Sequence, residues 1–217
     1  IAPTWLSMLA MVVITAVTCL IAGRHHSLAT ATLGLAGGFA TPLLLATGED
    51  RPIALFAYLG VLDFGLLHLS RKRQWGGLAL FALVVTLLYE AAWVATRMRP
   101  DRMPLGMLIV VGLSALFVAF AETSQTSDDA TPSQRPQAFG VARLIAALSP
   151  FVFAMHTSVA GVVVEHALMT SAFLVVLHGA TILFARREGS PFVAVLGAGA
   201  TAAVTLVAIS HAVSVNE

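Results

Sequence analysis

Long apolar segments separated by short polar breaks account for almost the whole chain. Eight such segments lie at about residues 5–23, 28–47, 53–70, 76–96, 104–121, 141–164, 167–185 and 191–213. A hydrocarbon core about 30 Å thick requires roughly 20 consecutive apolar residues in a helix. The pattern therefore predicts an all-α fold: a polytopic bundle of about eight transmembrane helices, forming a single membrane domain over residues 1–217. The longest polar break, residues 122–137, is rich in Ser, Thr, Asp and Pro and predicts a flexible loop.

The composition supports lipid as the main solvent of this chain. Of its 217 residues, 58% are hydrophobic and 11% are charged, whereas roughly a quarter of the residues of a soluble domain are charged. The formal net charge of +1 gives no basis for binding nucleic acid, because the basic residues cluster at predicted helix ends. Cys19 is the only cysteine, which excludes a disulfide framework and a site made of several thiolates.

Lysine and arginine are unequally divided between the two sides of the predicted bundle. The first, third, fifth and seventh loops carry eight of the twelve basic residues, and the second, fourth and sixth carry four. Because cytoplasmic loops hold the excess of basic residues, we expect the odd-numbered loops inside the cell and both termini outside. The basic fourth loop, with Arg97, Arg99 and Arg102, argues against this orientation.

The segment 28–47 combines small residues with a proline. Gly34, Gly37 and Gly38 let helix backbones approach closely, which stabilises helix contacts in lipid. Pro42 predicts a kink, and Thr41 is placed to satisfy a carbonyl that the kink frees. We interpret these positions as helix-packing residues. The alternative is a broken helix that lines a substrate site, as transporters use.

A faint internal repeat relates the second to fourth predicted helices to the sixth to eighth. Each copy begins with a proline-containing helix, and its second helix ends in a basic cluster. Three pairs of positions correspond: Pro42 with Pro150, Asp63 with His178, and Arg71 with Arg186. The two copies would be parallel, as the charge count also requires. Chance is a competing explanation, because identity beyond this pattern is absent.

The segments LGLAGGFATPLLLATG and ALFAYLGVLDFGLLHLSRKRQW carry a family resemblance. They resemble a large bacterial family of predicted multi-pass membrane proteins of unknown function. Members of that family are similar to one another in having repeated hairpins with a GGF-x-x-PLLL-x-TG core and a basic-Trp ending. The close match covers about residues 33–75. The resemblance implies a multi-pass protein of the bacterial inner membrane, and it supplies no reaction and no catalytic residue. Members of that family are usually longer, so we expect this chain to be a part or an abridged version.

Ionisable side chains inside the predicted spans are candidates for function. A charged group at the membrane centre costs about 2.5–3.5 kcal/mol on insertion scales, so such a group needs a partner or a role. Asp63 and His178 each precede a cytoplasmic basic cluster by eight residues, so a pair between them is geometrically feasible. Glu90, His156 and His211 fall toward the outer face, where they could form a second polar cluster.

Three interpretations compete for these five groups. Each group could satisfy a neighbouring helix by a hydrogen bond or extend to the membrane interface. Asp63 and His178 could relay protons or ions, since the unperturbed pKa of histidine is about 6.5. His156, His178 or His211 could ligate a metal or a pigment, although no HExxH motif or clustered histidine spacing is present. The first interpretation is favoured, and no metal ligand is assigned.

Motifs for catalysis are missing from the sequence. It contains no GxSxG motif and no phosphate-binding glycine loop, so enzymatic activity is not expected and no cofactor is implied, with bound lipid or pigment left open. The leading interpretation is a structural or accessory integral membrane subunit of a larger bacterial membrane assembly, with membrane lipids and other integral membrane subunits as partners. The alternative is a transporter of a small solute or a lipid-linked precursor, with a site near the kinks at Pro42 and Pro150. An intramembrane transferase that uses Glu90 and the histidines ranks third.

Overall fold

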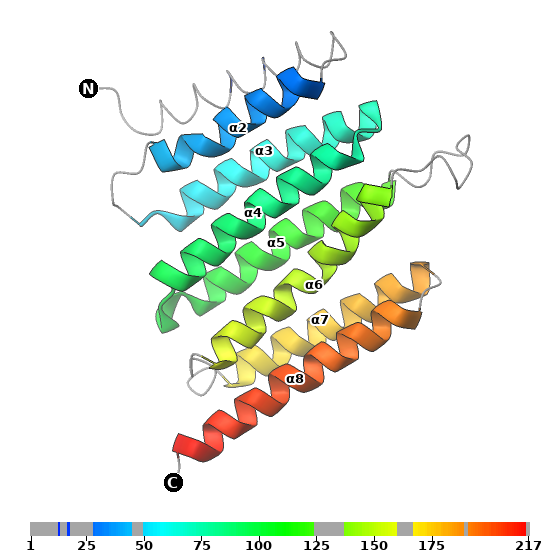
Figure 1. The fold of residues 1–217 in the computed structure, drawn as a ribbon. Helices are drawn as coiled ribbons and strands as arrows, with labels where there is room; N and C mark the ends of the chain where they lie inside the picture. Colours follow the sequence, from blue (N-terminus) through cyan, green and yellow to red (C-terminus); the bar gives the residue numbers. More distant parts are fainter. Residues whose placement is uncertain are drawn as a thin grey trace. The chain divides into compact units, whose positions relative to one another are not determined.

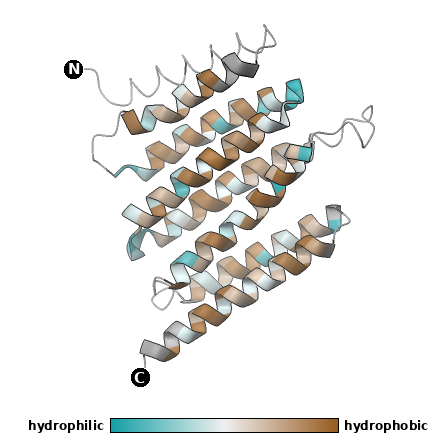
Figure 2. Cartoon of the chain, viewed as in Figure 1, coloured by the Kyte–Doolittle hydropathy of each residue, from teal (hydrophilic) through white to brown (hydrophobic). Residues whose placement is uncertain are grey.

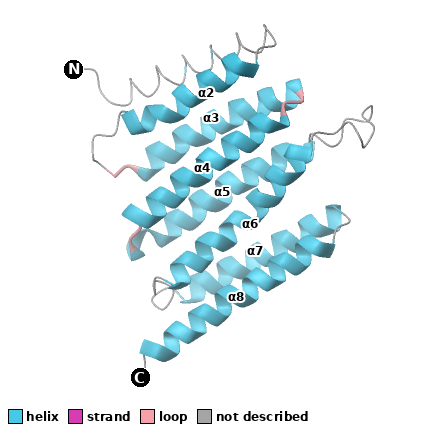
Figure 3. Cartoon of the chain, viewed as in Figure 1, coloured by secondary structure: helices cyan, strands magenta, loops and turns pink. Residues whose placement is uncertain are grey.

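The computed structural model describes residues 28–44, 50–123, 137–159, 167–188 and 191–215, together with Val13 and Val17. Every regular element in these residues is helical (Figure 3). The elements are α2 (Leu28–Leu44), α3 (Pro52–Arg73), α4 (Gly76–Arg97), the 3-10 turn η1 (Pro100–Arg102), α5 (Met103–Thr123), α6 (Gln137–Val159), α7 (Ala167–Glu188) and α8 (Pro191–Val215). The predicted all-α class is confirmed.

The seven α-helices correspond to seven of the eight predicted spans. Six of them, α3 to α8, are long and apolar enough to cross a membrane, and hydrophobic residues predominate along them (Figure 2). Helix α2 is shorter, with an apolar part over Leu33–Leu44. The first predicted span, residues 5–23, lies outside the described residues apart from Val13 and Val17, and so do residues 124–136 of the predicted loop.

The described helices are labelled in Figure 1. Their contacts divide the chain into two compact units. Unit 1 comprises residues 1–97 and 116–143 and contains α2, α3 and α4. Unit 2 comprises residues 98–115 and 144–217 and contains α7 and α8. Helices α5 and α6 each contribute one part to each unit. The single membrane domain expected from the sequence stays a prediction.

In unit 1, α3 and α4 form a hairpin closed by a tight turn. Gln74 adopts a left-handed conformation with φ of 57°, and the Trp75 N–H donates to the Ser70 carbonyl at 2.9 Å. In return, the Ser70 hydroxyl donates to the Trp75 carbonyl at 2.6 Å. Helix α3 continues through the basic cluster that was expected to follow it, because cations stabilise the negative end of the helix dipole. The last turn of α3 contains Arg71, Lys72 and Arg73.

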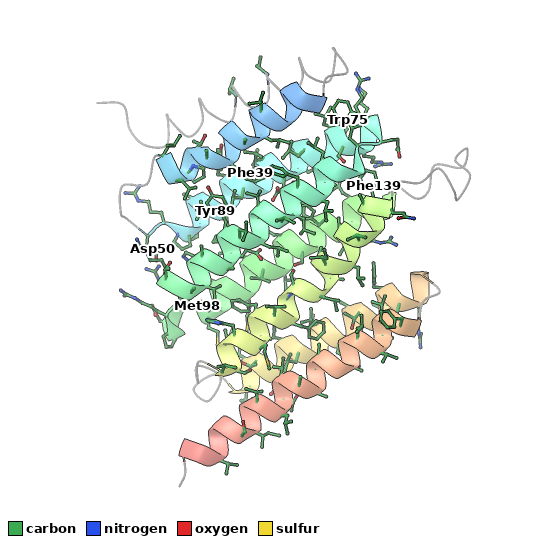
Figure 4. All side chains as sticks on the ribbon, viewed as in Figure 1. Phe39, Asp50, Trp75, Tyr89, Met98 and Phe139 are labelled. Atoms are coloured by element: carbon green, nitrogen blue, oxygen red, sulfur yellow. The ribbon has the colours of Figure 1, made fainter. Side chains whose placement is uncertain are left out.

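The opposite end of this hairpin is held by Trp93 of α4. Its indole N–H donates to Asp50 Oδ1 at 3.1 Å, and its ring packs edge to face on Phe56 of α3 with centroids 5.6 Å apart. Pro52 begins α3. Proline is well tolerated there, because an N–H group at the first position of a helix has no partner within the helix. Asp50 and Trp75 therefore mark the two ends of the hairpin (Figure 4).

The interior of unit 1 is filled by apolar side chains from all three of its complete helices. Helix α2 packs against α3, and α3 packs against α4. Burying each such side chain stabilises the packing chiefly through close van der Waals contact, since lipid removes most of the hydrophobic driving force between helices. The buried apolar residues include Leu35, Phe39, Leu59, Leu66, Leu78, Ala82 and Leu83.

In unit 2, α7 packs against α8, and glycine makes the approach close. A Cβ atom at Gly197 of α8 would lie 2.6 Å from Thr181 Oγ1 of α7. A second close approach joins the unit 2 parts of α5 and α6, where a Cβ atom at Gly106 would lie 2.9 Å from the ring of Phe153. One buried cluster contains a residue of each of α6, α7 and α8, namely Ala154, Leu174 and Val204.

Candidate functional site

The proline inside α2 leaves one backbone carbonyl without its helical partner, and a tyrosine of α3 supplies a replacement. Pro42 has no N–H, so the carbonyl four residues earlier, that of Gly38, loses its intrahelical bond. The hydroxyl of Tyr58 donates to this carbonyl at 2.8 Å. Thr41, which the sequence suggested for this task, instead donates to the carbonyl of Gly37 at 3.0 Å.

A second tyrosine donates to the next carbonyl along α2. The Tyr89 hydroxyl of α4 forms a hydrogen bond with the carbonyl of Phe39, and the two residues lie beside each other in Figure 4. The Phe39 ring also packs edge to face on Phe81 with centroids 6.3 Å apart. Tyr58 and Tyr89 are the two tyrosines of the chain. Both therefore donate to carbonyls in the GGF part of the GGF-x-x-P sequence, Tyr58 to Gly38 and Tyr89 to Phe39.

The proline inside α6 is accommodated by two serines. Pro150 frees the carbonyl of Ala146, again four residues earlier, and the hydroxyl of Ser149 donates to it at 3.0 Å. Ser149 Oγ in turn lies 2.9 Å from Ser114 Oγ of α5. Helix α6 is continuous through Pro150, because serine hydroxyls can replace the missing backbone donor in a membrane helix.

Asp63 lies in the middle of α3 and is fully buried. Its Oδ2 accepts a hydrogen bond from Thr86 Oγ1 of α4 at 2.8 Å. Its Oδ1 is buried and has no hydrogen-bond partner among the described residues. One oxygen of a carboxyl group inside a membrane-spanning hairpin is therefore unsatisfied, which is costly in such an environment.

A second buried carboxyl group, that of Glu90, lies one helical turn along α4 from Thr86. Glu90 follows Thr86 by four residues, which places the two side chains on the same face of α4. Glu90 is 6% exposed and shares this face of α4 with Thr86, the hydrogen-bond partner of Asp63. In the part of the chain that the structure describes, neither carboxyl group forms an ion pair. Asp63, Thr86 and Glu90, named here the carboxyl pair site, make up the most polar point inside unit 1.

The hairpin of unit 2 has a polar contact at the corresponding positions. His178 Nδ1 of α7 lies 3.4 Å from Thr201 Oγ1 of α8, and 23 residues separate this pair, as they separate Asp63 from Thr86. Asp63 and His178 are each the twelfth residue of a 22-residue helix. The position that corresponds to Glu90 carries Thr205, which is exposed and donates to the Thr201 carbonyl. The second carboxyl group therefore has no counterpart in α8.

The remaining candidate residues are distributed over both units. His156 of α6 is exposed, and the side chain of His211 lies outside the described residues. Asp63 lies in unit 1 and His178 in unit 2, and each has its threonine partner within its own unit. Glu90 and His156 also belong to different units. Among the described residues no group of three or more His, Cys, Asp or Glu side chains is placed to hold a metal ion.

The glycines expected to pack helices differ in their surroundings. Gly38 is buried and Gly34 is half-buried, whereas Gly37 is exposed and a Cβ atom there would meet nothing within 4 Å. Their role in packing stays a prediction.

Sequence reasoning did not identify the two tyrosines or Thr86 as partners. Their signal in the sequence is weak, because hydroxyl side chains are common in membrane helices and only tertiary packing selects the acceptor. A proline with tyrosines on the following helices is the pattern that could have suggested the contact.

Comparison with known families matches residues 1–215 to the family described as predicted membrane protein (DUF2339). No curated protein and no solved structure matches the chain. The match extends the resemblance of residues 33–75 to almost the whole sequence, and it agrees with six helices that are long and apolar enough to cross a membrane. The chain belongs to the DUF2339 family of predicted membrane proteins.

Proposed function

We propose that this protein is a structural, accessory subunit of a larger membrane assembly in the bacterial inner membrane. The observation that carries the proposal is the use of polar groups at the prolines inside α2 and α6. The carbonyls of Gly38, Phe39 and Ala146 already accept hydrogen bonds from side chains of this chain. A substrate site built on a broken helix needs such carbonyls for its ligand, so their internal use favours a packing role.

The outward faces of α7 and α8 suit an accessory role. These two helices are the least buried of the six described spans, and their exposed side chains are large and apolar. A continuous apolar face of this kind is covered by lipid or by another integral membrane subunit. The residues concerned are Leu168, Val175, Val176, Leu183, Phe192, Val195, Leu206 and Ile209.

The test is the native mass of the full chain extracted from its own membranes in mild detergent, with every co-purifying chain identified. We expect partners in fixed stoichiometry. We expect Gly38→Leu to abolish their co-purification, because Gly38 is buried beside the Tyr58 contact, and Asp63→Asn to leave it intact. A monomer or homodimer without partners would contradict the proposal.

A second candidate function, transport of a small solute or lipid-linked precursor, is favoured by one observation. The carboxyl pair site places two carboxyl groups inside a membrane-spanning hairpin without a basic partner among the described residues. Such groups mark solute and proton pathways in membrane proteins. Uptake into proteoliposomes that is lost in Asp63→Asn or His178→Gln, with folding intact, would support transport over the accessory role.

The internal repeat is a separate proposal. We infer that the α3–α4 and α7–α8 hairpins are copies of one unit, because their polar pairs occupy the same register. An equal loss of stability in Thr86→Val and Thr201→Val is the expected result of this equivalence, since each change removes one interhelical bond and keeps the side-chain volume.

A further inference from the structure

Two buried carboxyl groups in one hairpin raise the question of what neutralises them. Two negative charges inside a membrane-spanning hairpin repel each other and lose the solvation that water would give them. Asp63 receives a single hydrogen bond, from Thr86, and its Oδ1 receives none. No hydrogen bond to the Glu90 side chain lies within the described residues. The oxygen atoms at this point therefore have unused capacity to bind a positively charged partner.

The charged groups of the surrounding helices do not supply that partner. Helix α2, which packs on α3, has no charged residue between Leu28 and Leu44. The arginine and lysine residues of α3 and α4 lie in the last turns of those helices, and His68 of α3 is exposed. Arg143 of α6 is buried and has its own interaction, but it does not pair with Asp63 or Glu90. The neighbouring titratable groups Tyr58 and Tyr89 donate their hydroxyls to α2.

We propose that Asp63, Thr86 and Glu90 form an exchangeable binding site for a small monovalent cation, a proton or an alkali ion, inside the α3–α4 hairpin. The inference does not depend on whether the accessory or the transport function holds. Two carboxyl groups and one hydroxyl offer too few oxygen ligands for Ca²⁺, which takes six to eight, or for Mg²⁺, which requires near-octahedral coordination. The unpartnered Oδ1 of the fully buried Asp63 is the observation that points to a ligand, beyond the mere presence of two acidic residues.

The hairpin of unit 2 provides a comparison within the same chain. It has the polar pair His178 and Thr201 but carries Thr205 where unit 1 carries Glu90. We therefore expect the cation site in unit 1 alone.

The experiment measures labelling of the full chain in detergent micelles by a hydrophobic carbodiimide, which reacts with protonated carboxyl groups in apolar surroundings. Peptide mass spectrometry locates the label. We expect Asp63 and Glu90 to be labelled, with a yield that falls about tenfold per pH unit above its midpoint. Asp101, exposed in the turn after α4, is the matched control and reacts with a water-soluble carbodiimide instead.

Labelling is compared at fixed pH in sodium chloride and in an equal concentration of N-methyl-glucamine chloride. This comparison distinguishes a bound alkali ion from a bound proton. Protection by sodium alone identifies an alkali-ion site, and equal labelling in both salts identifies a proton site. In Glu90→Gln, the pH midpoint of Asp63 labelling shifts, because the two carboxyl groups interact. Thr86→Val also shifts it, and Thr86→Ser restores the original midpoint. The Thr86 variants test whether its hydroxyl acts on the Asp63 carboxyl group, since apolar packing alone would not respond to the hydroxyl.

The carbonyl stretching band of a protonated carboxylic acid in the infrared spectrum is the second measurement. It should disappear as the pH rises, and also on addition of sodium if the site binds an alkali ion, and Asp63→Asn should remove its Asp63 component. Absence of the band together with absence of labelling in the folded protein would overturn the proposal. An Asp63 midpoint that is unchanged in Glu90→Gln would overturn the assignment of both groups to one site.

Discussion

The Tyr58 hydroxyl donates a hydrogen bond to the Gly38 carbonyl, the group that Pro42 deprives of its helical partner. The contact joins α3 to the proline-containing part of α2, where lipid offers no substitute donor. It explains why a proline is tolerated within the apolar part of α2. It also ties the GGF-x-x-P sequence to a residue 20 positions later in the chain.

We predict that Tyr58→Phe destabilises the protein by about 1 kcal/mol, because it leaves a buried carbonyl without a donor. The measurement is thermal or denaturant-induced unfolding in detergent. In a Pro42→Ala background the same change should cost less, since the new N–H at residue 42 can satisfy Gly38.

The control for this cycle is Thr96→Val, which removes an exposed hydroxyl bonded to Ala92 of its own helix. It should have the same small effect in both backgrounds. An equal loss of stability on Tyr58→Phe in the Pro42 and Pro42→Ala backgrounds would contradict this role. It would mean that the Tyr58 hydroxyl does not compensate for the N–H group that Pro42 lacks.

The close approach of α7 and α8 gives a second prediction. Gly197→Ala would place a Cβ atom 2.6 Å from Thr181 Oγ1 and 3.1 Å from Thr181 Cβ, so one of the helices must shift. We expect a loss of about 1–3 kcal/mol in stability, the usual cost of overpacking. Gly199→Ala is the matched control, since a Cβ atom there would meet nothing within 4 Å. Equal melting temperatures for the two variants would be inconsistent with the packing described.

The pair of Ser114 and Ser149, beside Pro150 of α6, gives a third prediction. Ser149→Ala removes the donor to the Ala146 carbonyl and the contact with Ser114, whereas Ser114→Ala removes only the latter. We expect Ser149→Ala to destabilise the protein by about 1 kcal/mol and Ser114→Ala by less. Unfolding of both variants in the same detergent provides the comparison. Equal losses in the two variants would mean that the bond between the serines, rather than that to Ala146, provides the stabilisation.

The orientation in the membrane is a fourth prediction. The background variant is Cys19→Ser. In it, Lys72→Cys should react with a membrane-impermeant maleimide only after the cells are opened, because the third loop is expected in the cytoplasm. Asp101→Cys, in the fourth loop, should react with the same reagent in intact spheroplasts. Both residues are exposed. Labelling in the opposite sense would place both termini inside the cell and show that the basic fourth loop controls the orientation.

The sequence by itself determined the all-α class and, within about four residues, most of the described helix boundaries. These features follow from the length of each apolar segment and the polar residues at its ends, both of which are local properties. The basic residues after Ser70 belong to α3, although hydropathy alone ended the span before them, because a charged last turn remains helical at an interface. The resemblance at residues 33–75 likewise indicated the family that matches residues 1–215.

Tertiary structure alone decided which polar groups meet. The sequence left a pair between Asp63 and His178 open as geometrically feasible. In the structure Asp63 contacts Thr86 and His178 contacts Thr201, each within its own hairpin. Hydrogen-bond partners in a membrane helix depend on rotation about the helix axis and on which neighbour packs against it, and neither is encoded in hydropathy. For the same reason Gly38 and Phe39 of α2 receive their donors from Tyr58 and Tyr89 on two other helices.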